Sequence, residues 1–162
     1  REWKTRKATP PHTVPPSLKD FKIPCHDGRV WLRVWNYAPN GDYTWFIQAP
    51  QGSEMYDDPL AEVGCSYAIR GFDYDYLGLL WFSDVVWRDG RWIVQPEHVF
   101  ETGITGLVNQ AKKEADQDGP KHTELLRRMQ QSYRILMTRA IKGLYVWFED
   151  DETREHIENS IA

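Results

Sequence analysis

Few residues in this sequence combine a reactive side chain with the spacing that chemistry requires. Asp73 and Asp75 flank Tyr74 and would suit a paired-acid site, although such a run is more often a polar turn with solvated carboxylates. Arg139 lies in the amphipathic run of residues 132–140, where a cation near a helix end interacts favourably with the helix dipole. The five histidines are scattered, and none stands at metal-ligand spacing from another ligand. We therefore expect no metal site.

The motifs of self-contained enzymes are missing from the chain. It has no G-x-x-x-x-G-K-[ST] phosphate loop, no G-x-S-x-G nucleophile elbow and no plausible Ser/His/Asp trio. Cys25 and Cys65 fit neither a zinc spacing nor a disulfide framework, which favours a reducing, cytoplasmic setting. No apolar run approaches the ~20 residues that a membrane span needs, so we expect no membrane partner.

Composition narrows the class of protein further. The chain has 162 residues, of which 41% are hydrophobic, and this is enough for one domain with a real core. Eight tryptophans, eight tyrosines and six phenylalanines indicate aromatic packing in the core and at interfaces. The formal net charge of -4 is unlike that of a free-standing nucleic-acid binder. Contact with nucleic acid would need a local patch or a partner domain.

The first half of the chain reads as strands after an irregular start. Residues 1–28 form the expected irregular segment, because four prolines lie among residues 10–16 and disfavour helix. Short β-prone runs follow at residues 30–35, 43–47, 63–69 and 76–82. The run at 76–82 is the most apolar in the chain and predicts a buried strand.

The second half predicts a hairpin, two helices, a strand and a last helix. Asp89 and Gly90 form the two-residue turn of the hairpin. Helical periodicity covers residues 105–116 and 123–142, Gly143 ends the second helix, residues 144–148 form a strand, and a final helix covers 152–160. A helix that leads directly into an apolar strand predicts a three-layer α/β fold.

Two segments resemble the motifs of superfamily 1 helicases. Residues 62–65 and 69–78 resemble motif V, and residues 132–140 with 142–146 resemble motif VI. Both are most similar to an uncharacterised bacterial family related to the Schlafen group 3 DNA/RNA helicase domain. The resemblance implies that residues 1–162 are a single C-terminal, RecA-like domain of a P-loop ATPase. Its fold would be a three-layer sandwich with a mostly parallel sheet and an added β-hairpin.

The resemblance also assigns roles to particular residues. Arg139 matches the motif VI arginine, which stabilises charge on the γ-phosphate of ATP across a domain cleft. Gly71 matches the motif V glycine and allows a tight strand-to-helix turn, while Asp73 replaces a glutamate that lies near the ribose. Gly71, Asp73 and Arg139 are thus the expected nucleotide-binding residues, and Thr138 and Arg134 are the expected supports of Arg139.

The chain departs from the family pattern at two of these positions. Arg70 stands where the family has glutamine, and Asp73 is a shortened carboxylate. Arg70, Thr138 and Arg134 are the candidates for contacts to nucleic acid or for coupling between nucleic acid and nucleotide. The departures keep a second interpretation open, in which the chain is a degenerate helicase-fold module that binds or scaffolds without ATPase activity.

The implied ligands and partners belong to the full-length protein. ATP and Mg²⁺ would bind in a site shared with an N-terminal P-loop domain, which supplies the phosphate loop and the Mg²⁺ carboxylate. This fragment alone is expected to bind no cofactor and to have no activity. DNA or RNA is the expected macromolecular partner.

Overall fold

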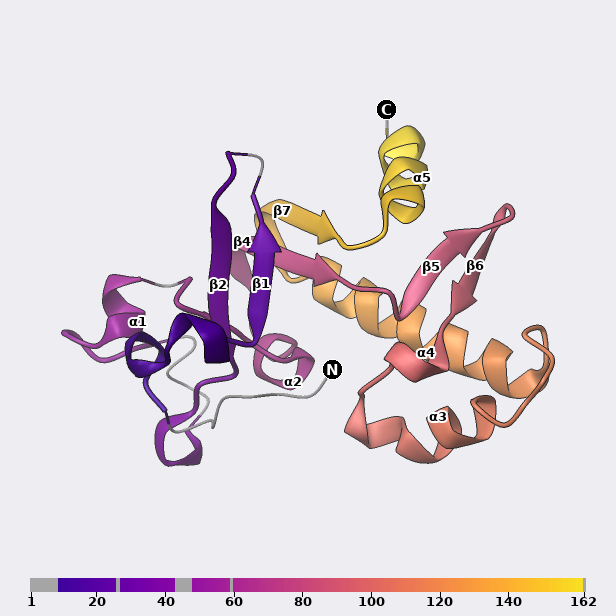
Figure 1. Ribbon diagram of the computed structural model, residues 1–162, viewed down its shortest axis with the longest axis horizontal. Coiled ribbons are helices and arrows are strands. Elements are labelled where there is room, and N and C mark those ends of the chain that lie inside the picture. Colours follow the sequence, from indigo (N-terminus) through magenta and orange to yellow (C-terminus); the bar gives the residue numbers. More distant parts are fainter. Residues whose placement is uncertain (1–8, 26, 43–47, 59, 162) are drawn as a thin grey trace. The chain divides into compact units, whose positions relative to one another are not determined.

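The computed structural model describes residues 9–25, 27–42, 48–58 and 60–161 (Figure 1). The chain divides into two compact units, of which the first ends at Gly71 and the second starts at Phe72. Each unit has strands and buried residues of its own. This division reflects where contacts within the chain are dense, and it does not test whether residues 1–162 form a single domain. The expected single domain therefore stays a prediction.

A three-stranded sheet organises the first unit. β1 (Phe21–Pro24) runs antiparallel to β2 (Val30–Trp35), and β3 (Glu62–Val63) pairs with β2 in parallel. The strand expected at residues 30–35 is therefore confirmed. The strand expected at residues 43–47 lies outside the described residues.

The irregular segment expected over residues 1–28 needs a correction, because it contains β1. Phe21 and Ile23 are buried while Lys22 and Pro24 are exposed, so β1 has the alternation of a strand with one covered face. Pro24 is tolerated because β1 is an edge strand, where a residue without an N–H breaks no inner ladder. Pairing with β2 decides the conformation here, and the prolines upstream do not.

Short helices connect the strands of the first unit. They are the 3-10 helices η1 (Pro11–Thr13), η2 (Pro16–Leu18) and η3 (Pro39–Gly41), and the α-helices α1 (Glu54–Asp57) and α2 (Ser66–Ile69). The strand expected over residues 63–69 is wrong beyond Val63. Ala68 and Ile69 are both buried, and their N–H groups donate to the carbonyl oxygen of Cys65, so one helical turn places both side chains in the interior.

The second unit is built on a pair of parallel strands, β4 (Tyr74–Trp81) and β7 (Ala140–Phe148). Beside them lies the hairpin of β5 (Val85–Arg88) and β6 (Arg91–Val94). Its turn is confirmed at Asp89 and Gly90, whose φ angles of 51° and 76° are those that a two-residue turn between twisted strands requires.

Three α-helices and two 3-10 helices complete the second unit. They are η5 (Pro96–His98), η6 (Thr102–Ile104), α3 (Thr105–Ala111), α4 (Pro120–Met137) and α5 (Asp151–Ile161). All three expected helices are confirmed, with changed ends. α4 starts at a proline, whose missing N–H costs nothing in the first turn, and it ends at Met137 rather than at residue 142. Gly143 therefore lies inside β7 and does not end the helix.

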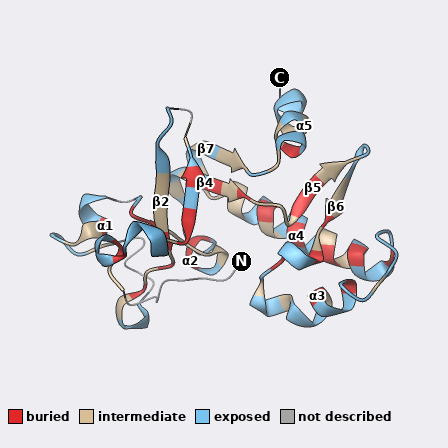
Figure 2. Cartoon of the chain, in the orientation of Figure 1, coloured by how far each residue is buried: buried red, intermediate tan, exposed pale blue. Residues whose placement is uncertain are grey.

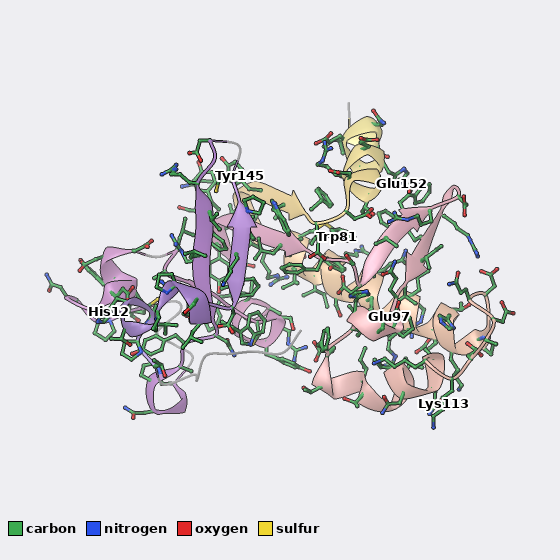
Figure 3. All side chains as sticks on the ribbon, viewed as in Figure 1. His12, Trp81, Glu97, Lys113, Tyr145 and Glu152 are labelled. Carbon is green, nitrogen blue, oxygen red and sulfur yellow. The ribbon has the colours of Figure 1, made fainter. Side chains whose placement is uncertain are left out.

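The core of the second unit lies where α4 packs against the strands. One side of α4 is buried, as Figure 2 shows, and Leu125 is completely inaccessible to solvent. Trp81, labelled in Figure 3, stacks on Tyr133 of α4 with 4.0 Å between the ring centroids. Each such buried side chain stabilises the fold by roughly 1.5–3 kcal/mol, so this cluster fixes the end of α4 relative to β4.

The chain is thus a mixed α/β protein with an added β-hairpin, as expected. Its described strands form three small sheets in place of one mostly parallel sheet: β4–β7 and β2–β3 are parallel, whereas β1–β2 and β5–β6 are antiparallel. Two parallel strands need a connection that brings the chain back to the end of the sheet where the first strand began, and helices form part of these connections here. The RecA-like three-layer arrangement stays a prediction.

Candidate functional site at the amino ends of β4 and β7

Arg139 is held between the end of α4 and the start of β7. The N–H of Thr138 donates to the carbonyl oxygen of Arg134 at 3.1 Å, and its hydroxyl donates to that of Ile135 at 3.0 Å. The N–H of Arg139 donates to Leu136 at 3.1 Å, and its own carbonyl accepts the N–H of Tyr74 at 2.8 Å. Both backbone groups of Arg139 are therefore satisfied, so its side chain leaves from a fixed point.

The parallel register brings Asp73 to Arg139. Tyr74 is paired with Ala140, and the two charged residues stand one position before these partners. Arg139 Nη1 lies 3.1 Å from Asp73 Oδ1. The arginine side chain is 31% exposed and the aspartate side chain 61%, so the ion pair sits at the surface with the guanidinium partly covered.

One donor of the guanidinium has no partner. Arg139 Nε is buried and makes no hydrogen bond within the part of the chain that the structure describes. A buried N–H without an acceptor lowers stability, typically by about 1–3 kcal/mol, unless something else supplies the acceptor. In this conformation Nε is out of reach of a ligand, and an anionic oxygen would meet the part of the side chain that is exposed.

A second ion pair lies next to the first. Lys142 Nζ is 2.9 Å from Asp75 Oδ2, and both side chains are exposed. A β-bulge makes this pairing possible, because Asp75 faces two residues of β7, Ile141 and Lys142, where the ladder has one extra residue. Asp73 and Asp75 thus bind two different cations and do not form the paired-acid site that their spacing also allowed.

Gly71 lies between α2 and β4 rather than between a strand and a helix, which corrects the expected turn. Its φ is not in the positive range and a Cβ would meet no atom within 4 Å, so the backbone here does not require glycine. Its expected place near the nucleotide stays a prediction.

The other predicted residues lie at the surface. Arg70 is exposed in the first unit, with its guanidinium carbon 4.2 Å from the ring centroid of Tyr67. Arg134 and Thr138 are exposed at the end of α4. Asp73, Thr138 and Arg139 therefore lie together at one edge of the second unit. Arg134 contributes through its carbonyl oxygen, which accepts the N–H of Thr138, the residue before Arg139.

Two carboxyl groups with raised pKa values were not predicted from the sequence. Burial raises the pKa of Glu62 to about 8, opposed by the hydrogen bond that it accepts from the N–H of Tyr37. Burial likewise raises the pKa of Asp84 to about 6, although Asp84 accepts a 2.6 Å hydrogen bond from the hydroxyl of Tyr133. Each of the two residues lies next to an apolar stretch, which is the only clue that the sequence gives. Such short apolar runs do not show whether the neighbouring carboxyl group is buried.

Metal and membrane features can be stated for the described residues. No group of three or more His, Cys, Asp or Glu side chains among them could hold a metal ion. None of the helices formed by those residues is long and apolar enough to cross a membrane.

Comparison with known proteins decides the family. The family model for the Schlafen group 3 DNA/RNA helicase domain matches residues 3–150, which is nearly the whole chain. The chain belongs to this family. The expected helicase-related family is thereby confirmed. The assignment of motifs V and VI, and the position of the chain as a second, C-terminal RecA-like domain, stay predictions.

A relative in yeast extends the comparison. The uncharacterized protein YPL245W of Saccharomyces cerevisiae is 24% identical over 139 residues, which cover 86% of this chain and 28% of that protein. The Schlafen group 3 helicase chain therefore spans only about 28% of the length of this relative. No solved structure matches the chain.

Proposed function

We propose that this chain is the second motor domain of a helicase-like ATPase and supplies the motif VI arginine, Arg139, to a shared ATP site. The observation that carries the proposal is the placement of Arg139. Its guanidinium is partly covered, it is fixed at the start of β7, and its buried Nε finds no acceptor among the described residues. A phosphate oxygen of a nucleotide bound across a domain cleft would contact the exposed part of this side chain, and would satisfy Nε once the side chain turns outward.

The chemistry explains why an arginine is suited to this position. Phosphoryl transfer depends mainly on positioning and on stabilising the charge of the transferring phosphoryl group. A guanidinium offers a planar fork of donors that matches phosphate oxygens, whereas an ammonium offers a point charge. In the proposed site Gly71 and Asp73 lie near the nucleotide and Arg139 contacts its phosphates.

The rest of the site is assigned to other parts of the full-length protein. This sequence has no phosphate loop, so an N-terminal P-loop domain would supply it together with the carboxylate that holds Mg²⁺. Binding and hydrolysis of ATP would close and open the two domains along DNA or RNA. Arg70, Thr138 and Arg134 are the proposed contacts to nucleic acid or to the coupling path.

A RecA-like architecture is part of the same proposal. Its support is the parallel pair β4–β7 together with α4, which leads from the core of the second unit to the amino end of β7.

The decisive experiment removes the guanidinium from the full-length protein. Arg139→Ala is expected to lower ATP turnover by about a thousandfold or more, the range for arginines that act on phosphoryl transfer, and to weaken nucleotide binding only by the small factor that one exposed ion pair contributes. Arg139→Lys should restore little of the activity, because an ammonium lacks the planar fork. Steady-state turnover and nucleotide titration measure the two properties separately.

A matched control tests for a general effect of losing a cation. Arg154 is an exposed arginine of α5 that pairs with Asp151 and Glu158 of its own helix, so Arg154→Ala should leave turnover unchanged. Unchanged turnover in Arg139→Ala would overturn the assigned role. The absence of any Walker-type loop from the upstream sequence of the full-length protein would overturn the ATPase proposal as a whole.

The second candidate function is a degenerate helicase-fold module that binds or scaffolds without hydrolysing ATP. Two observations favour it: Arg70 stacks on Tyr67, and Asp73 is engaged by Arg139 instead of being free for a ribose. A full-length protein that carries a phosphate loop, binds nucleic acid and shows no ATP turnover would support this candidate over the first.

A further inference from the structure

The ion pair between Asp73 and Arg139 follows from strand register. Asp73 directly precedes β4 and Arg139 directly precedes β7, and the first residues of these parallel strands are partners. The backbone bond of 2.8 Å from Tyr74 N–H to the Arg139 carbonyl fixes the two positions against each other. The backbone positions of Asp73 and Arg139 are therefore adjacent whenever the sheet is formed, which keeps the carboxylate within reach of the guanidinium.

Carboxylates and phosphates compete for the same guanidinium donors. Both offer paired anionic oxygens that match the fork of an arginine. Asp73 Oδ1 lies 3.1 Å from Nη1, while Nε has no hydrogen-bond partner among the described residues, so the carboxylate engages the guanidinium only in part. A ligand with more negative charge and more oxygens would bind the fork better than Asp73 does.

We propose that Asp73 is a positioning residue that restrains Arg139 in the resting protein, and that a nucleotide phosphate must displace it. The inference rests on the proposed function of Arg139. It differs from the role that the family resemblance gives to this position, which is a contact to the ribose. The two roles predict opposite effects of removing the carboxylate charge.

The test uses the full-length protein and the variant Asp73→Asn. Loss of the restraint lowers the KM for ATP by roughly twofold to fivefold and changes kcat less. This factor is the free energy of an exposed ion pair converted into a ratio of binding constants. Asp73→Glu keeps a carboxylate and should have a KM close to that of the parent protein. A ribose contact would instead make the KM of Asp73→Asn rise.

Asp75→Asn is the matched control. It removes the same charge two residues away, on an exposed side chain that pairs with Lys142 and not with Arg139. General electrostatic attraction of ATP would lower KM equally in both variants, whereas the restraint lowers it only in Asp73→Asn. Inorganic tripolyphosphate, used as a competitive inhibitor, has no ribose, and its inhibition constant should fall in Asp73→Asn by the same factor as KM.

The outcomes separate the two proposals. If Arg139→Ala abolishes turnover while Asp73→Asn behaves like Asp75→Asn, or has a raised KM, the restraint is wrong and the proposed function stands. If Arg139→Ala turns over ATP normally, the proposed function is wrong, and the proposed restraint of Arg139 by Asp73 is wrong as well. A lower KM and a lower tripolyphosphate constant confined to Asp73→Asn would support the restraint.

Discussion

At the scale of the residue, the charged groups of this chain differ most in how they are solvated. Arg139 and Asp73 share a surface ion pair, which ordinarily contributes about 0–1 kcal/mol. Asp84 keeps part of its surface in solvent, but its carboxyl group is surrounded by protein, and burial raises its pKa to about 6. The first pair can exchange partners at little cost, while Asp84 is a group whose ionisation is coupled to folding.

The pKa of Asp84 gives the stability of the second unit a pH dependence of known sign. The ordinary value is 3.8, and the folded value is higher. Between about pH 4 and pH 6 the folded state therefore holds a proton that the unfolded state has released, so stability falls as the pH rises through this window. Above it the ionised carboxylate depends on the hydroxyl of Tyr133.

Tyr133→Phe tests this dependence. The variant removes the hydroxyl that donates to Asp84 Oδ1 at 2.6 Å. We expect the free energy of unfolding to fall by about 1–2 kcal/mol at pH 7.5 and by less at pH 5, where the carboxyl group is largely protonated. Urea unfolding at the two pH values measures both. Tyr145→Phe, on a side chain that is 69% exposed, is the control, and an equal loss at both pH values would contradict the assigned coupling.

At the scale of the element, α4 depends on a cap that comes from outside the helix. The carboxylate of Glu114 accepts the N–H groups of Lys121 and His122 at 2.9 and 3.0 Å, and these are donors that the first turn of a helix leaves free. Gly119 makes room for it, because a Cβ at this position would lie 2.3 Å from the Glu114 carboxyl carbon. Gly119 and Glu114 thus together form the N-terminal cap of α4.

Gly119→Ala should therefore behave like Glu114→Ala. The added methyl group displaces the carboxylate, and each variant should lower Tm by roughly 2–4 °C, the effect of losing one helix cap in a chain of this size. The double variant should be no less stable than either single variant, since both remove the same hydrogen bonds. Thermal unfolding of the four proteins measures this, and additive losses would show that Gly119 and Glu114 act independently.

At the scale of the whole molecule, the division between two compact units falls at Gly71 and Phe72. Arg70, Gly71 and Phe72 are exposed and belong to no helix or strand, which is where a protease gains access to a folded chain. The same stretch links the first unit to Asp73 and therefore to the candidate site.

Limited digestion with trypsin tests the division. Within residues 9–161 the first cut is expected after Arg70, and mass spectrometry identifies the two products. Arg70→Gln removes this cleavage site and should delay digestion. Early cuts after Lys112 or Lys113, which are exposed inside the second unit, would contradict the boundary at Gly71.

The sequence by itself determined the features that contiguous residues encode. The turn at Asp89-Gly90, the stripe of α4 and the strand β4 were all predicted, because turn geometry and helical or strand periodicity are local properties. The burial expected for the strand at residues 76–82 was wrong in part, because Tyr76 is 59% exposed and only Leu79 and Trp81 of β4 are buried. The resemblance of residues 62–78 and 132–146 to helicase motifs also indicated the helicase-related family, which the family match over residues 3–150 confirms. The helix α2 was missed because the β-prone Ile69 favoured a strand, whereas one helical turn buries Ala68 and Ile69 together.

Only the tertiary structure decided which charges meet. Asp73 and Arg139 are 66 positions apart in the chain (139 − 73), and no local pattern fixes the parallel register that makes them neighbours. The same holds for the pairing of Asp75 with Lys142 and for the raised pKa of Asp84, since each depends on elements brought together by folding. Local propensity places a side chain on an element, whereas register and burial choose its partner.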